Sequence, residues 1–152
     1  GDHRDLHSFP TRRSFDLAGC EHAELDALCA ESDLVSLHVP LTPQTRRLID
    51  ARRIALMKAT AILVNTARGG LVELDALHEA LAAGRLAGAG LDVFETEPPD
   101  PRHPIFALDN VAVSNHIGWY SEEAMRDLQR LAAEEVVRVL RGERPRHWLN
   151  PW

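Results

Sequence analysis

Cysteine is scarce in this sequence: Cys20 and Cys29 are the only two, and they are too far apart for a redox or zinc motif. We therefore expect a reduced, cytoplasmic protein. No apolar run approaches the ~20 residues that a membrane-spanning helix needs, and we expect no signal segment at the start. A net charge of −6 argues against a general nucleic-acid binder, which needs a basic face. These absences predict a soluble globular unit with neither a membrane nor a nucleic-acid partner.

The opening segment, residues 1–16, shows neither a helical nor a strand period. One interpretation is a disordered leader. Another is that residues 3–17, HRDLHSFPTRRSFDL, resemble translated sequencing-adapter sequence from assembled environmental reads. In both interpretations the segment carries no chemistry. Because the chain starts at Gly1 rather than at a methionine, we expect it to be a fragment of a longer protein.

From residue 21 onward, short apolar runs alternate with stretches of helical period. The helical stretches are expected around residues 25–29, 51–57, 73–83 and 121–141, the last capped by Ser121 and stopped by Gly142. The strands are expected at 34–39, 61–66, 87–93 and 111–114, the first two as buried strands. Alternation of this kind predicts an α/β fold with a parallel sheet.

The stretch 61–70, AILVNTARGG, is the feature around which the chain is organised. An apolar strand here ends in polar residues, and Arg68 follows at the carboxyl edge of the sheet, where α/β proteins bind ligands. Gly69 and Gly70 allow a tight turn and a close approach of backbone to a ligand. Arg68 could grip a carboxylate with two parallel hydrogen bonds, or it could be an ordinary surface arginine.

Three further polar side chains follow the next two strands: Asp92, Glu97 and His116. Each also has a purely structural interpretation: Asp92 as a strand-end cap, Glu97 as a solvated acid and His116 as a structural histidine. Together with Arg68 they are expected at one edge of the sheet. Arginine, glutamate and histidine suit the reduction of a 2-keto acid: the first holds the carboxylate, the last supplies a proton, and the glutamate orients the imidazole. The hydride must come from a cofactor, because no side chain delivers it.

Residues 34–40, 62–70, 88–98 and 115–118 resemble, in this order, successive signatures of the D-isomer-specific 2-hydroxyacid dehydrogenases. The resemblance covers about residues 33–151. It implies Arg68, Glu97 and His116 as the catalytic residues and NAD as the cofactor, with NADP left open. It implies a small-molecule 2-hydroxy or 2-keto acid as the substrate, and a homodimer for the full-length parent. The implied cofactor contacts are Val39, Pro40, Thr45, Thr66, Ala67, Arg68, Asp92, His116 and Gly118.

The run 119–123, WYSEE, resembles the branch that includes the C-terminal-binding proteins. In that branch the tryptophan lines the substrate pocket, so Trp119 joins Arg68 as an expected substrate contact. Most other family members have glycine there, and Trp119 therefore implies a narrower or different substrate.

The departures from the family pattern concern the cofactor and the substrate domain. None of the nine glycines has the G-x-G-x-x-G spacing that seats a pyrophosphate, and the acidic residue that holds the ribose is absent. The separate substrate domain is absent too. The resemblance implies a sheet order 3-2-1-4-5-6-7, of which this chain holds the last four strands. Residues 17–141 would then be the C-terminal part of an NAD-binding domain and 142–152 a tail, with strand 34–39 as an open apolar edge that favours aggregation.

Three functions remain open at this point. The first is part of an NAD(H)-dependent 2-hydroxyacid dehydrogenase, with this chain inactive by itself. The second is a dinucleotide-sensing scaffold that binds protein partners, and the third is an incomplete gene product. The upstream coding sequence, or turnover of a keto acid by the full-length protein, would separate them.

Overall fold

The computed structural model describes residue 19 and residues 21–146. The chain divides into two compact units, Gly1–Val113 and Ser114–Trp152, and each unit is described by itself.

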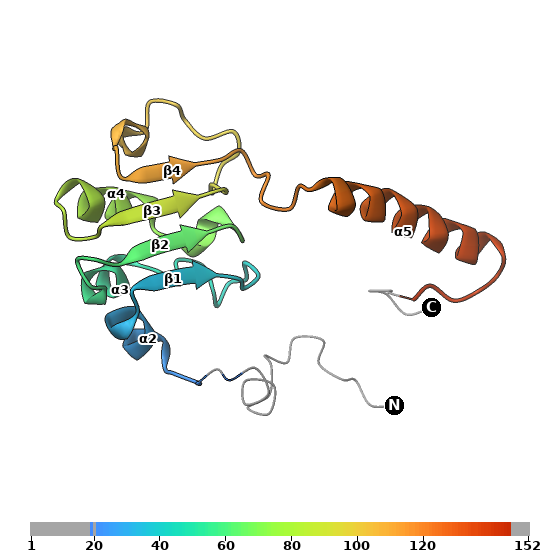
Figure 1. Ribbon diagram of the computed structural model, residues 1–152, viewed down its shortest axis with the longest axis horizontal. Helices are drawn as coiled ribbons and strands as arrows, with labels where there is room; N and C mark the ends of the chain where they lie inside the picture. Colours follow the sequence, from blue (N-terminus) through green and yellow to red (C-terminus); the bar gives the residue numbers. More distant parts are fainter. Residues whose placement is uncertain (1–18, 20, 147–152) are drawn as a thin grey trace. The chain divides into compact units, whose positions relative to one another are not determined.

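The first unit is built on a four-stranded parallel sheet in the order β1-β2-β3-β4 (Figure 1). The strands are β1 (Leu34–Leu37), β2 (Ile62–Asn65), β3 (Gly88–Leu91) and β4 (Val111–Val113). Every neighbouring pair is parallel, with Val35 opposite Leu63, Leu63 opposite Ala89, and Ala89 opposite Val111. The expected α/β fold with a parallel sheet is confirmed, and each strand is one to three residues shorter than its sequence pattern suggested.

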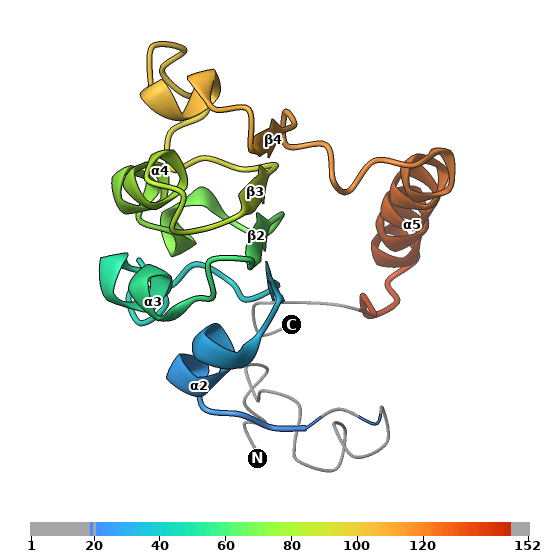
Figure 2. The same cartoon turned by 60° about the vertical axis from the view of Figure 1, so that its left-hand side comes forward.

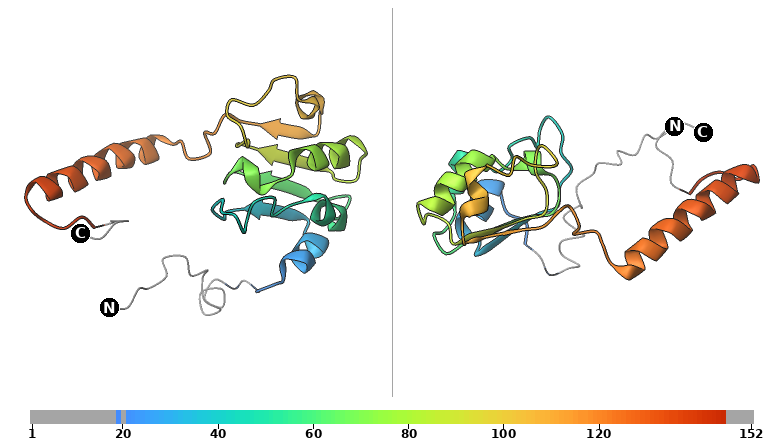
Figure 3. Two further views of the ribbon diagram at one scale, coloured as in Figure 1. Left: turned by 180° about the vertical axis from the view of Figure 1, so that it is seen from behind. Right: turned by 90° about the horizontal axis from the view of Figure 1, so that it is seen from above.

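Helices cover one face of this sheet (Figures 2 and 3). They are α2 (Leu25–Glu31), α3 (Ala51–Leu56) and α4 (Leu74–Ala82). Two short 3₁₀ turns lie in the connections: η1 (Gly69–Leu71) between β2 and α4, and η2 (Pro104–Ala107) between β3 and β4. The capping of α3 was not foreseen: the Asp50 carboxylate accepts a hydrogen bond from the Arg53 amide.

Burial in β1 and β2 alternates along each strand, which corrects the expectation of strands buried on both faces. Val35, Leu37 and Leu63 point to the helices and are buried. Leu34 and Ile62, which pair with each other across the sheet, are 60% and 42% exposed. The reason is that α2, α3 and α4 lie on the same side. Among the described strands, β1 is an edge of the sheet, as expected.

The core lies between the sheet and the helices. Burial there raises the pKa of the Cys29 thiol, which makes it a packing residue rather than a reactive one. The largest fully buried side chains of this core are Ile49, Leu63, Leu71, Leu77, Leu86 and Ile105.

The second unit contains the long helix α5 (Glu122–Leu140). Ser121 caps it as expected: its hydroxyl accepts a hydrogen bond from the Ala124 amide at 3.0 Å. Gly142 follows the helix with a φ of +74°, a conformation that glycine adopts without strain. In the described part of the chain, no helix has the length and apolar character needed to cross a bilayer.

Asp26 on α2 ties this helix to α3. Its carboxylate accepts hydrogen bonds from the Arg52 guanidinium at 2.7 and 3.0 Å and from Arg53 Nε at 2.9 Å. Hydrogen bonds from Arg52, and next from Arg53, lower the pKa of Asp26 from 3.8 to about 2. The ionised form is therefore favoured in the folded state, and the resulting stability is present above pH 3.8 and is lost as the pH falls toward 2.

We expect Asp26→Asn to flatten the fall of the urea midpoint between pH 5 and pH 2, because asparagine does not ionise. Arg52→Lys keeps the charge but loses the two-point grip, so it should flatten the same slope by less. Urea unfolding at half-unit pH steps measures both effects. If the urea midpoint of Asp26→Asn falls with pH as steeply as that of the unsubstituted chain, this prediction is wrong.

Candidate functional site

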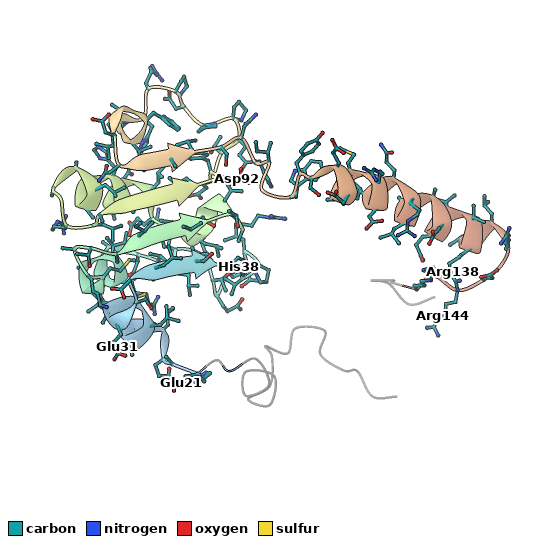
Figure 4. The ribbon with its side chains drawn as sticks, in the orientation of Figure 1. Glu21, Glu31, His38, Asp92, Arg138 and Arg144 are labelled. Atoms are coloured by element: carbon teal, nitrogen blue, oxygen red, sulfur yellow. The ribbon has the colours of Figure 1, made fainter. Side chains whose placement is uncertain are left out.

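The expected site residues of the first unit follow the carboxyl ends of the strands. Figure 4 labels His38 and Asp92 at the ends of β1 and β3, on the same edge of the sheet. Loops leave this edge after each strand, and the backbone there is held by side chains that the sequence pattern did not single out.

Asn65, the last residue of β2, shapes the loop that carries Arg68. The Asn65 side chain is 1% exposed. Its Nδ2 donates to the Arg68 carbonyl at 2.9 Å, and its Oδ1 accepts from the Ala67 amide at 3.1 Å. Sequence reasoning gave Asn65 no role. The available signal was an amide side chain at the end of an otherwise apolar strand.

Arg68 itself is exposed at this edge. Its Nη1 donates to the Ala67 carbonyl at 2.6 Å. Among the described residues, no carboxylate forms an ion pair with Arg68. An arginine with a fixed main chain and an uncommitted charge is suited to hold an anion.

A pocket brings four of the expected site residues together. Its lining comes from the ends of β1 and β2: His38, Val39, Pro40, Leu41, Ala67 and Arg68. The apolar wall and the single guanidinium resemble the usual composition of a small-molecule site, in which few polar groups fix the orientation of a mostly apolar ligand. Thr66, also expected here, is exposed beside this pocket.

Thr45 is committed to its own turn. Its hydroxyl donates to the Pro40 carbonyl at 2.7 Å and accepts from the Thr42 amide at 2.7 Å. The threonine therefore fixes the loop after β1, next to the pocket residue Pro40.

The loop after β3, residues 92–103, is called here the Glu97 loop. Asp92 at its start is buried, and its amide donates to the Asn65 carbonyl at 3.0 Å. Glu97 Oε1 accepts a hydrogen bond from the Phe94 amide at 3.0 Å. The Glu97 carboxylate is therefore folded back on its own loop.

Gly69 joins the Arg68 and Glu97 loops. A Cβ on Gly69 would lie 1.9 Å from the Phe94 carbonyl carbon and 2.2 Å from the Glu95 nitrogen. The close approach expected of this glycine is thus to a neighbouring backbone. Arg46 and Glu95 also form an ion pair between the loops after β1 and β3. The loop that carries Arg68 therefore packs against the Glu97 loop at Gly69, and the Arg46–Glu95 ion pair connects the Glu97 loop to the loop after β1.

The second unit holds His116, Gly118 and Trp119. His116 has a φ of +53°, uncommon for a residue with a side chain. The Trp119 indole donates to the His116 carbonyl at 3.0 Å, and its ring meets Tyr120 edge to face with centroids 5.6 Å apart. Because His116 belongs to this unit, its expected place beside Arg68 and Glu97 stays a prediction. Across the described residues of both units, no group of His, Cys, Asp and Glu side chains forms a metal site.

A parallel sheet with a ligand-sized pocket at its carboxyl edge is typical of nucleotide-binding α/β domains. Residues 6–118 match the family described as D-isomer specific 2-hydroxyacid dehydrogenase, NAD binding domain, and the match overlaps the opening segment. The chain belongs to this family, and NAD is the cofactor of the domain.

Curated relatives agree with this assignment. The chain is 48% identical over 130 residues to a glyoxylate reductase of Thermofilum pendens, covering 86% of this chain and 38% of that protein. It is 47% identical over 127 residues to a D-3-phosphoglycerate dehydrogenase of Methanocaldococcus jannaschii, covering 84% and 24%. The chain therefore spans well under half the length of these relatives.

A solved structure shows the same fold. The D-lactate dehydrogenase of Aquifex aeolicus, complexed with NAD and lactic acid, superposes with a TM-score of 0.80 at 33% identity. The superposition covers 90% of this chain and 45% of that one.

Proposed function

We propose that the chain is the C-terminal part of the NAD-binding domain of a D-2-hydroxyacid dehydrogenase, which interconverts a 2-keto acid and a D-2-hydroxy acid. The observation that carries the proposal is Arg68, exposed beside an apolar pocket, with its main chain fixed by Asn65. Glyoxylate, hydroxypyruvate and lactate occur in the names of similar proteins, so a small 2-keto acid is the proposed substrate class.

The residues of the first unit fit one side of a dinucleotide. Val39, Pro40 and Ala67 offer an apolar wall, and the Asn65 side chain is hydrogen-bonded to the main chain of the adjoining loop at Ala67 and Arg68. NAD, when bound, supplies or accepts the hydride. The residues for the pyrophosphate and ribose, a glycine-rich turn and an acid, are not in this sequence. We therefore propose that the chain alone is inactive.

Each catalytic residue has a proposed part in the reaction. Arg68 holds the substrate carboxylate through its planar guanidinium and polarises the adjacent carbonyl. His116 gives a proton to the carbonyl oxygen during reduction and takes it back during oxidation. Glu97 is proposed to favour the protonated imidazole by its negative charge. Trp119 is proposed to narrow the substrate site.

A second candidate is a dinucleotide-sensing scaffold, favoured by the likeness of residues 119–123 to the C-terminal-binding proteins. For either candidate, we propose that the parent protein is a cytoplasmic homodimer. They differ in turnover: a dehydrogenase oxidises NADH in proportion to keto acid, and a scaffold does not need to.

We expect the parent protein that contains this segment to oxidise NADH when glyoxylate or hydroxypyruvate is added, with a kcat of about 1–10³ s⁻¹, the usual range for enzymes. Absorbance at the NADH band measures the rate. The present chain is the control and should give no turnover. A parent that binds NADH tightly but leaves every small keto acid unreduced would favour the scaffold.

A further inference from the structure

His103, at the far end of the Glu97 loop, makes contacts that neither the family resemblance nor the proposed reaction uses. Its Nδ1 accepts a hydrogen bond from the Ile105 amide at 3.2 Å, which caps η2. Its Nε2 lies 3.1 Å from Asp75 Oδ1, in the first turn of α4. The His103 side chain is only 20% exposed, while that of Asp75 is 91% exposed.

These two contacts define the tautomer of the ring. A nitrogen that accepts from an amide carries no proton, so Nδ1 is the bare nitrogen of the neutral imidazole. The proton is then on Nε2, and this N–H donates a hydrogen bond to Asp75 Oδ1. The ring therefore bridges η2 and α4, and the His78 ring, also on α4, meets it edge to face with centroids 6.0 Å apart.

The segment between Glu97 and His103 is stiff. Pro98, Pro99 and Pro101 restrict three of its five residues. The remaining two are also bonded: Asp100 Oδ1 accepts from the Arg102 amide at 2.9 Å, and the Asp100 carbonyl accepts from the His103 amide at 3.0 Å. A displacement of His103 is thus passed along the loop toward Glu97 rather than absorbed.

We propose that His103 is a positioning residue for Glu97: it tethers the Glu97 loop to α4 through Asp75 and so maintains the hydrogen bond between Phe94 and Glu97. The role given to Glu97 rests on the proposed function. The tether itself is a property of this chain, and it is measured without NADH or a keto acid.

The test is hydrogen exchange of single amides, followed by NMR on the full chain. The Phe94 amide reports the bond to Glu97, while the Phe106 and Leu108 amides report η2 through their bonds to the His103 and Ile105 carbonyls. His103→Ala should speed exchange at all three amides, by about tenfold at Phe94. The Asp92 amide, bonded to β2, should keep its rate.

His103→Asn separates the tether from the cap. Asparagine is a good cap and can accept from the Ile105 amide, but it is too short to reach Asp75. Phe106 and Leu108 should therefore regain slow exchange while Phe94 stays fast. If all three amides return to the exchange rates of the unsubstituted chain, His103 only caps η2, and the proposal is overturned.

Asp75→Ala provides the same test without touching the loop. Because the Asp75 side chain is largely exposed, the variant should fold, and Phe94 exchange should rise about threefold. Arg102→Ala is the matched control: it removes an exposed loop ion pair with Asp100 and should leave Phe94 unchanged. Two further results would overturn the proposal. One is unchanged exchange at the Phe94 amide in folded Asp75→Ala. The other is a nitrogen NMR spectrum of the unsubstituted chain that shows His103 protonated on Nδ1.

Discussion

Gly69→Ala is expected to lower the free energy of unfolding by about 3 kcal/mol, the upper end of the usual cost of overpacking. The new methyl group would lie 1.9 Å from the Phe94 carbonyl carbon, far inside van der Waals contact. The atoms that it meets are main-chain atoms of Phe94 and Glu95, which cannot rotate away as a side chain would. Relief requires the loops after β2 and β3 to separate.

Gly90→Ala is the matched control for this prediction. A Cβ on Gly90 would meet the Val64 methyl groups at 3.7 and 3.8 Å, an ordinary contact distance. Because alanine has less freedom than glycine in the unfolded chain, this variant should be unchanged or more stable by up to ~1 kcal/mol. Urea unfolding of the two variants side by side gives the comparison, and equal stabilities would show that the loop contact yields easily.

Arg68→Lys in the full-length parent is expected to lower kcat/KM for a keto acid by about 10²-fold, comparable to the loss of one transition-state hydrogen-bond donor. Lysine keeps the positive charge but lacks the planar fork that grips a carboxylate at two points. The loss should appear in both KM and kcat, because the proposed role combines holding the carboxylate with polarising the carbonyl.

Arg47→Lys controls for the general effect of replacing an arginine in the loops after these strands. The Arg47 guanidinium is directed to Glu73, at 3.5 Å, and both side chains are partly exposed. Exposed ion pairs of this kind contribute little, so kcat/KM should stay within about twofold. If Arg68→Lys is as active as Arg47→Lys, Arg68 does not anchor the substrate.

The fold was predictable because its signals are local. The alternation of apolar runs and helical periods placed all four strands, and Ser121 and Gly142 bounded α5 correctly. The one-sided burial of β1 and β2 was not predictable, since it depends on which face the helices cover. Leu34 and Leu37 look alike in the sequence, yet only Leu37 is buried.

The site was predictable only in outline. The strand-end rule placed Arg68, Asp92 and Glu97 at loops of the carboxyl edge, where the structure has them. The partners of these loops are distant in sequence or depend on backbone geometry: Gly69 meets Phe94, and Asn65 bonds to the Arg68 carbonyl. No spacing rule reveals such contacts. The assignment of roles to Arg68, Glu97 and His116 stays a prediction.

The two hydrogen bonds of Asn65 have a consequence for the affinity of the proposed carboxylate site at Arg68. A loop that becomes ordered only when its ligand arrives loses conformational entropy on binding, and that loss subtracts from the affinity. Here the amide of Asn65 already holds the main chain of Ala67 and Arg68 in the folded protein. Only the side-chain rotamers of Arg68 remain to be fixed on binding, and this loss of side-chain entropy costs at most about 2 kcal/mol. The ordering of this loop is thus completed during folding, and a carboxylate that binds as proposed would meet a preorganised main chain.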